Sequence, residues 1–289
     1  MTEAEQEKRR QENLAVLAEL SLMDDEFMSA VYQDDLPCAD LTIQILLGRD
    51  DIHAQSVVTQ ETITNFQGRN VRLDIHAKAD GRDIDVEIQR EDSGAVPERA
   101  RYNGSMMDAK QLQPGDPFTA LHDTYVIFIT EKDPLGVHPP ICHIERVIEE
   151  TGDRFSDGSH IIYVDSEFAG NTTPLAKLMH DFRCKNPDDM YFDVLKRRAN
   201  HFKKTPEGVT EMCKALDELT RKREAEAEAR GEARGEARGE ARGEARGEFM
   251  ANLKTIKNLM KSTGQTVDKV MESMGIDPAA RQKYLAFIS

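Results

Sequence analysis

The sequence predicts an α/β fold with a helical extension at its C-terminal end. Residues 71–90 alternate apolar and polar side chains on both sides of an Asp80-Gly81 pair, which is typical of a β-hairpin. Residues 124–130, TYVIFIT, are apolar, β-branched or aromatic and favour a buried central strand. Helix-forming composition and helical spacing dominate the last third of the chain. The 289 residues suffice for one sizeable domain and an appendage.

The predicted hairpin carries acidic side chains on one face, opposite its apolar residues. Counting outward from a two-residue turn, Asp74 faces Glu87 and Arg72 faces Gln89. Like charges directly across two strands, with Cβ atoms about 5 Å apart, are destabilising. We therefore expect this solvent-facing pair to bind a cation, and oxygen ligands suit Mg²⁺.

The hairpin sequence VRLDIHAKADGRDIDVEIQ resembles the D…(D/E)xK signature of the PD-(D/E)xK nucleases. It is most similar to their transposase branch, the recombination-promoting nucleases or putative transposases. Two later segments resemble the same branch, ARYNGSMMDAKQL and SHIIYVDSEFAGNTTPLAKLMHDFRCKNPDDMYF. The resemblance covers roughly residues 21–220. It implies a restriction-endonuclease-like core, in which helices flank a central mixed β-sheet.

The resemblance also implies a metal site. Asp74 and Glu87 would bind Mg²⁺ or Mn²⁺, with the backbone carbonyl of Ile88 as a further ligand. An acidic residue of the first helix of the domain often completes such sites. Asp24 occupies the matching position, and its neighbours Asp25 and Glu26 are close alternatives; the DDE run would also simply favour a helix N-terminus.

Gln89 stands where the family signature has a catalytic Lys, and it is counted with Asp74 and Glu87 among the catalytic residues that the resemblance implies. Gln can hydrogen-bond the attacking water but supplies no charge. Arg72, predicted to face Gln89, would then supply that charge; the alternative is an ordinary surface ion pair.

The helix expected after the motif hairpin is the other source of substrate contacts. In this superfamily it packs beside the active site. Arg99 would contact the scissile phosphate, and Tyr102 would hydrogen-bond near the metal. The alternative is the solvated face of an ordinary amphipathic helix.

Several further elements are expected around the hairpin. Helices are predicted at 3–20, 41–47, 97–112, 174–184, 187–203 and 206–230, and strands at 57–66, 141–147 and 160–164.

Four segments are expected along the chain: an N-terminal helix at 1–20, the nuclease-like domain at 21–225, a linker at 226–248 and a helical appendage at 249–289. The linker repeats the unit G-E-A-R. It has no apolar stripe, and we expect a solvated segment that is helical only when its neighbours continue into it. The appendage resembles a helix-turn-helix module, but oligomerisation or partner binding is an equal alternative.

The composition bounds the function. The net charge is −15, without an evident basic stripe, which argues against broad affinity for nucleic acid. The chain has no apolar run of membrane-spanning length, no signal peptide and no CxxC pair among its cysteines, so a cytoplasmic protein is expected. A metal-dependent DNA endonuclease of transposase type is the leading interpretation. A degenerate nuclease fold that binds DNA or a protein, and an RNase, remain alternatives.

Overall fold

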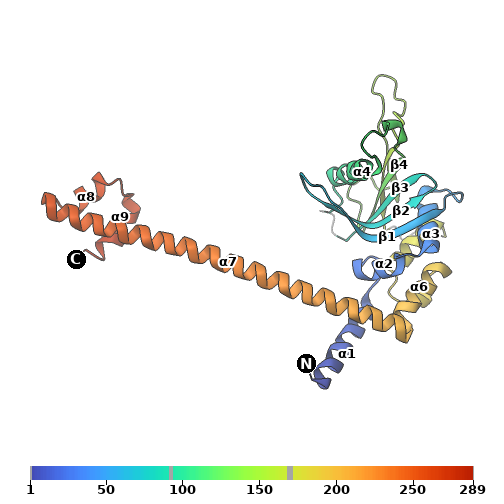
Figure 1. The fold of residues 1–289 in the computed structure, drawn as a ribbon, viewed down its shortest axis with the longest axis horizontal. Coiled ribbons are helices and arrows are strands. Elements are labelled where there is room, and N and C mark those ends of the chain that lie inside the picture. The colour runs from blue at the N-terminus through green and yellow to red at the C-terminus, as the bar shows by residue number, and fades with distance from the viewer. Residues whose placement is uncertain (1, 91–93, 168–171, 289) are drawn as a thin grey trace. The chain divides into compact units, whose positions relative to one another are not determined.

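The computed structural model describes residues 2–90, 94–167 and 172–288. The chain divides into two compact units, residues 1–218 and 219–289. The first unit contains the sheet and most of the helices (Figure 1).

A six-stranded mixed sheet is the centre of the first unit. Its order is β1-β2-β3-β4-β6-β5, with β1, β2 and β3 antiparallel, β3, β4 and β6 parallel, and β5 antiparallel to β6. The strands are β1 Ala54–Ile63, β2 Val71–Ala79, β3 Arg82–Gln89, β4 Asp123–Thr130, β5 Ile141–Ile144 and β6 Ser159–Asp165. A mixed sheet flanked by helices, followed by a C-terminal helical extension, confirms the predicted fold class.

The β2–β3 hairpin forms at the predicted turn. Asp80 and Gly81 have φ of 46° and 70°, the left-handed conformation that a type I′ turn requires at both central positions. Its register confirms the prediction from Ala79↔Arg82 outward to Ile75↔Val86. Asp74 and Glu87 lie one step beyond this last aligned pair.

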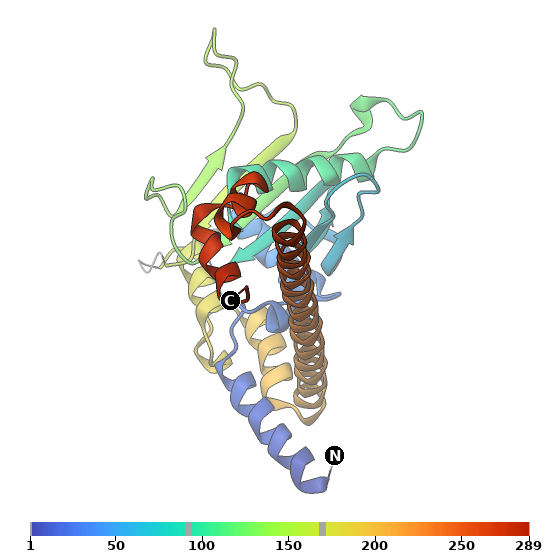
Figure 2. The same ribbon diagram turned by 90° about the vertical axis from the view of Figure 1, so that its left-hand side faces the viewer.

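Helices cover both faces of the sheet. The helices of the first unit are α1 Glu3–Glu19, α2 Asp25–Tyr32, α3 Leu36–Leu47, α4 Pro97–Gln111, α5 Pro174–Arg183 and α6 Asp193–Lys204. One large core joins α2, α3, α5 and α6 to one face, where Val86 and Ile127 point. A second core joins α4 to the other face, where Val126 and Phe128 point. Figures 1 and 2 show α4 alone across the sheet from α2, α3 and α6. The acidic residues of β3 therefore face α4 and not solvent.

Several predicted elements differ in extent from the structure. The helix expected at 41–47 begins earlier, as α3 at Leu36, and the strand expected at 141–147 ends earlier, as β5 at Ile144. The strand expected at 57–66 is β1, which ends at Ile63 and leaves residues 64–70 as a turn. The helix expected at 187–203 is a 3-10 turn at Pro187–Asp189 followed by α6. The break has a local cause: the buried Asp181 carboxylate accepts hydrogen bonds from the backbone N–H groups of Tyr191 and Phe192, at 2.8 and 2.9 Å.

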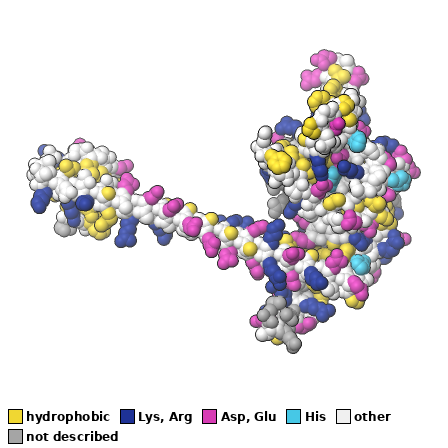
Figure 3. Space-filling view, in the orientation of Figure 1, with side chains coloured by type: hydrophobic (Ala, Val, Ile, Leu, Met, Phe, Trp, Pro, Cys, Tyr) yellow, Lys and Arg dark blue, Asp and Glu magenta, His cyan; other side chains and the backbone are white. Residues whose placement is uncertain are grey.

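The helix α7, Pro206–Thr263, includes the whole G-E-A-R repeat. The predicted linker is thus helical, and its repeat side chains are exposed. Figure 3 shows acidic and basic side chains along its length. In the second unit the end of α7 packs with α8 Val267–Ser273 and α9 Pro278–Leu285 around a small apolar core. None of the described helices is long and apolar enough to cross a membrane.

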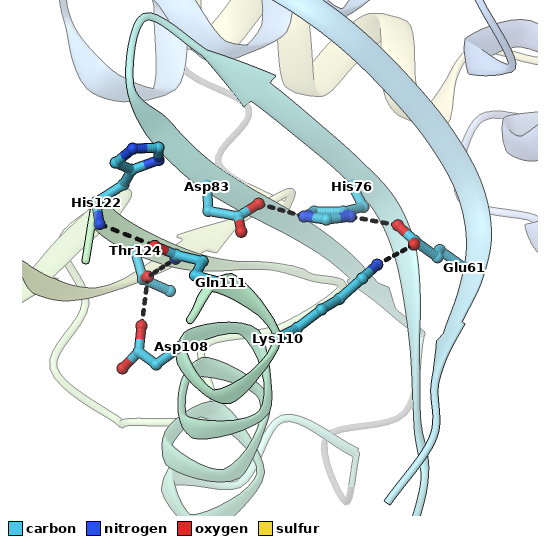
Figure 4. A network of polar contacts seen from close by, with 8 residues as sticks. All are labelled: Glu61, His76, Asp83, Asp108, Lys110, Gln111, His122 and Thr124. Atoms are coloured by element: carbon cyan, nitrogen blue, oxygen red, sulfur yellow. Dashed lines mark hydrogen bonds and ion pairs between the residues drawn. The ribbon is translucent and has the colours of Figure 1, made fainter. Parts of the chain in front are cut away.

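A buried ionic chain ties β1, β2 and β3 to α4 (Figure 4). His76 of β2 lies between the carboxylates of Glu61 and Asp83, and Lys110 of α4 contacts Glu61. His76 and Asp83 are both buried. Burial disfavours charge, but the two carboxylates hold the pKa of His76 above its usual value. Among the described residues, the His76 ring is the only side chain that contacts the buried Asp83 carboxylate.

We expect His76→Leu to destabilise the protein by about 3 kcal/mol, because it leaves the Asp83 carboxylate buried without a counter-charge. Urea unfolding measures the loss. The double variant His76→Leu/Asp83→Leu should recover part of it, since both partners are then apolar. A single variant as stable as the parent would show that the ionic chain does not hold these strands.

Candidate active site

Three carboxylates lie buried together beneath α4. Asp85 and Glu87 alternate along β3 and both have 0% exposure, and Asp74 of β2 has 5%. Asp85 and Glu87 lie level with Val126 and Phe128 of β4, which pack against α4. The acidic pair that the sequence predicts on a solvent-facing surface is therefore buried, and it has a third member.

Asp74 lies where β2 stops pairing regularly with β3, although β2 continues to pair with β1 as far as Val71. Val71 and Leu73 pack into the core beside α4, whereas Ile75, at the same parity, packs into the opposite core. The alternation thus changes at Asp74. Its carboxylate accepts hydrogen bonds from the Ile88 N–H at 3.0 Å and from Gln60 Nε2 at 3.2 Å. Gln60 has a φ of 54°, so a strained residue of β1 helps to orient this carboxylate.

Two side chains of α4 hold Glu87. Arg99 forms an ion pair with one carboxylate oxygen of Glu87. The buried Asn103 amide donates to the other oxygen at 3.0 Å and also to Asp85 Oδ2 at 3.1 Å. Asp85 Oδ1 is buried without a hydrogen-bond partner in the described part of the chain. The site therefore contains more negative charge than its own partners neutralise.

Burial and neighbouring negative charges raise the pKa values of all three acids. Burial, followed by the charge of Asp74, raises the pKa of Glu87 to about 8 although the Arg99 pair lowers it. Burial and the neighbouring Glu87 raise the pKa of Asp85 well above its usual value. Burial, opposed by the Ile88 hydrogen bond, and the charge of Asp25 raise the pKa of Asp74. Such clusters are typical of functional sites.

A cavity of about 1100 Å³ opens onto Asp74, and Arg99 and Asn103, which contact Glu87, also line it. Asp74, Ile88 and Gln89 line it from the sheet, and Tyr102 and Asn103 line it from α4. Its wall also contains five arginines: Arg69, Arg72, Arg90, Arg99 and Arg101. This local basic surface was not evident in the sequence, because its members come from separate segments.

The first helix of the domain contributes Asp25 to the cavity, and not the predicted Asp24. The Asp24 carboxylate accepts from the Ser21 N–H at 2.8 Å and pairs with Arg90 at 2.5 Å. Asp25 lines the cavity and lies 3.8 Å from Arg72. Arg72 therefore pairs with Asp25 and is not placed against Gln89 by any described contact.

Arg99 and Tyr102 of α4, which were predicted to contact the substrate and the metal site, contact other protein groups in this structure. Arg99 pairs with Glu87 and donates to the Gly94 carbonyl at 3.2 Å. The Tyr102 hydroxyl donates to the Arg69 carbonyl at 2.7 Å, so it fixes the β1–β2 turn. Gln89 packs so closely on Gly94 that a Cβ there would lie 1.8 Å from Gln89 Oε1.

Sequence reasoning missed Asp85 and Asn103 as members of the site. The parity of Asp85 with Glu87 was visible and places both side chains on one face. Asn103 lies one helical turn after Arg99, which places the two on one side of α4. What the sequence lacked was the packing of α4 over that face.

The donor set fits a hard divalent cation. Within the described ranges, no group of three or more His, Cys, Asp or Glu side chains is placed to hold a metal as it stands. Nevertheless, Asp85 has one oxygen without a partner among the described residues, and burial disfavours the ionised form of all three acids, so a bound cation would stabilise their carboxylates. Carboxylate and carbonyl oxygens are the ligands that Mg²⁺ and Mn²⁺ prefer.

The comparison with protein families gives one match. A family model described as PD-(D/E)XK nuclease family transposase matches residues 38–204, more than half of the chain. The matched segment contains all three buried acids and most of the cavity lining. No curated protein and no solved structure matches the chain.

We expect Asp74→Asn to unfold at the same or a higher temperature than the parent in EDTA, because the amide keeps an acceptor for Ile88 and removes one of three repelling charges. Mg²⁺ should raise the melting temperature of the parent and leave the variant unchanged, since a ligand that binds only the folded state stabilises it. Thermal unfolding with and without Mg²⁺ measures both effects. A large loss of stability in EDTA would instead make Asp74 a structural hydrogen-bonding residue.

Proposed function

This chain belongs to the PD-(D/E)XK nuclease family transposases, and we propose that it is a metal-dependent DNA endonuclease of the transposase or recombination type, acting in the cytoplasm. One observation carries the proposal: three buried carboxylates lie beside a cavity whose wall contains five arginines. Acidic oxygens suit a divalent cation, and arginines suit the phosphates of a nucleic acid.

The arginines of the cavity resolve the conflict with a net charge of −15. Arg72, Arg90 and Arg99 are engaged with Asp25, Asp24 and Glu87. Arg69 and Arg101 form no salt bridge with any residue that the structure describes, so both guanidinium groups are available to phosphate oxygens. Affinity for DNA would then be local to the cavity and strongly dependent on salt concentration.

Asp74, Glu87 and the Ile88 carbonyl would hold the Mg²⁺ or Mn²⁺ ion, and Asp25 replaces Asp24 as the candidate from the first helix. When bound, the ion would lower the pKa of a water molecule and polarise the phosphodiester. Gln60 and the Ile88 N–H keep the Asp74 carboxylate in place. Asn103 does the same for Glu87.

Gln89 and Arg99 would together supply the two properties of the missing Lys, a hydrogen bond to the attacking water and a positive charge. The Gln89 amide lines the cavity and can hydrogen-bond the attacking water. Arg99 brings the permanent charge, since a guanidinium stays protonated at any working pH and cannot act as a general base. Arg99, and not Arg72, contacts one of the acids. The charge that offsets the developing negative charge on phosphate would thus come from α4.

A catalytically degenerate fold that binds DNA or a protein is the second candidate. The observation that favours it is the Glu87–Arg99 pair, which already neutralises a carboxylate that the metal would need. Catalysis requires this pair to loosen when the ion binds. The degenerate fold requires it to persist.

Plasmid nicking across a series of divalent metals tests the proposed activity. We expect cleavage with Mg²⁺ or Mn²⁺ that is absent in EDTA and in an Asp74→Ala/Glu87→Ala control. Parallel assays on single-stranded RNA distinguish an RNase. Metal-independent cleavage by a folded parent protein would contradict the metal-dependent mechanism. Absence of cleavage would contradict the endonuclease and favour the degenerate fold.

The two arginines give a matched pair of variants. Arg99→Ala should lower the cleavage rate by roughly 10²-fold, the scale of losing one preorganised charge-stabilising group. Arg72→Ala should change the rate less, because Arg72 forms no salt bridge with any of the three buried acids and lies 3.8 Å from the more exposed Asp25. Single-turnover rates at saturating Mg²⁺ provide the comparison. Equal rates for Arg99→Ala and the parent would remove Arg99 from the mechanism.

A further inference from the structure

Phe66 is a large apolar side chain held almost entirely in water. It is 97% exposed, the highest exposure of any large apolar residue that the structure describes. It sits in the turn Asn65-Phe66-Gln67-Gly68 that joins β1 to β2. Asn at the first position and Gly at the fourth are typical of a type I turn. Phe is not needed there for the turn itself.

The turn that carries Phe66 is rigid. The Gly68 N–H donates to the Asn65 carbonyl at 3.4 Å, and the Gln67 N–H donates to the Asn65 side chain at 3.0 Å. The Asn65 N–H donates to Asn70 Oδ1 at 2.9 Å. The Asn65 amide also donates to the Tyr102 hydroxyl at 3.1 Å, which anchors the turn to α4. The aromatic ring is therefore presented from a fixed platform.

This platform directly precedes part of the cavity wall. Arg69 and Asn70 line the cavity, and Phe66 precedes Arg69 by three residues, so their Cα atoms are at most about 11 Å apart. Tyr102 lines the cavity and holds both Asn65 and Arg69. Figure 1 shows this turn beside α4. A nucleic acid that extends out of the cavity past Arg69 can therefore approach Phe66.

We propose that Phe66 is a stacking platform for a nucleobase of the DNA substrate, so that the preferred substrate has an unpaired or unstacked base near the cleaved phosphate. This inference rests on the proposed function and adds the form of the substrate. Aromatic side chains beside a cationic surface are the usual means of binding single-stranded nucleic acid. Phe is also among the side chains that insert between base steps and kink a duplex.

The surroundings of Phe66 favour a nucleobase over a protein partner. Its neighbours from Thr64 to Asn70 are polar or charged, apart from Gly68. A protein-binding patch needs contiguous apolar surface, which a single ring does not provide. A base offers a flat π-face for that one ring and a phosphate for the arginine.

The chain contains no Trp, so Phe66→Trp introduces a unique fluorescent reporter at the proposed contact. Phe118 provides a matched control, because it is 84% exposed and lies in the α4–β4 connection, which contributes no residue to the cavity lining, whereas the β1–β2 connection contributes Arg69 and Asn70. We expect a single-stranded oligonucleotide to quench Phe66→Trp and to leave Phe118→Trp unchanged. An oligonucleotide of abasic sites should quench neither. Each titration is run in EDTA and in Ca²⁺.

Fluorescence anisotropy of labelled DNA then measures binding by the alanine variants. Phe66→Ala should weaken binding of a single strand, and of a duplex with one unpaired base, by about tenfold. It should leave a fully paired duplex within about twofold, and Phe118→Ala should match the parent on all three. Both residues are exposed, so unchanged thermal unfolding verifies the fold.

The outcomes separate the two proposals. A parent protein that binds no DNA in either buffer would overturn the proposed function and the stacking role together. Parental binding with an unquenched Phe66→Trp, or with Phe66→Ala equal to the parent, would overturn the stacking role alone. Quenching of both Trp variants, with equal losses for both Ala variants, would also overturn it.

Discussion

Three carboxylates buried on one face of the sheet, beneath α4, are the constraint on which the rest of the site depends. Removing an ionised carboxylate from water costs several kcal/mol, and the interior offers these three one guanidinium, two side-chain amides and one backbone N–H. Each surrounding feature reduces that cost. The Ile88 N–H and Gln60 hold Asp74, Asn103 bridges Asp85 and Glu87, and burial keeps the pKa values high. The helix α4 completes the site because it both buries the acids and supplies their partners.

The distribution of charge matters more than its total. A net charge of −15 would repel a polyanion at long range, but salt screens exposed charges beyond about 10 Å. The cavity gathers Arg69 and Arg72 from the β1–β2 region, Arg90 from the end of β3, and Arg99 and Arg101 from α4. Salt bridges to acidic neighbours fix some of these groups in place and leave others free. The chain can therefore be acidic as a whole and still present phosphate ligands where the acids lie.

The sequence was sufficient for features set by local geometry. The Asp80-Gly81 turn determines the register of β2 and β3, and parity then places Asp85 with Glu87. It was insufficient for features set by packing. Nothing in the alternation of β3 says whether its polar face meets water or a helix, and here α4 covers it. Asp24 and Asp25 are adjacent in sequence, and only the orientation of α2 decides that Arg90 pairs with the first while the second faces the cavity. The same long-range packing brings Arg72 within 3.8 Å of Asp25.

In the proposed mechanism, Gly94 is the residue that would let the site work without the Lys of the family signature. The Gln89 amide occupies the space that any side chain at position 94 would fill, and the Gly94 carbonyl accepts from Arg99. The loop after β3 thus brings the neutral amide of β3 and the charged group of α4 to the same point. A single Lys on β3 would unite charge and hydrogen bonding in one flexible chain. Here the two properties come from two residues on separate elements, and the planar guanidinium is held by Glu87 and by the backbone. In the proposed mechanism the position of Arg99 would compensate for the departure at Gln89, so the pair, and not Gln89 alone, is the feature by which activity should be judged.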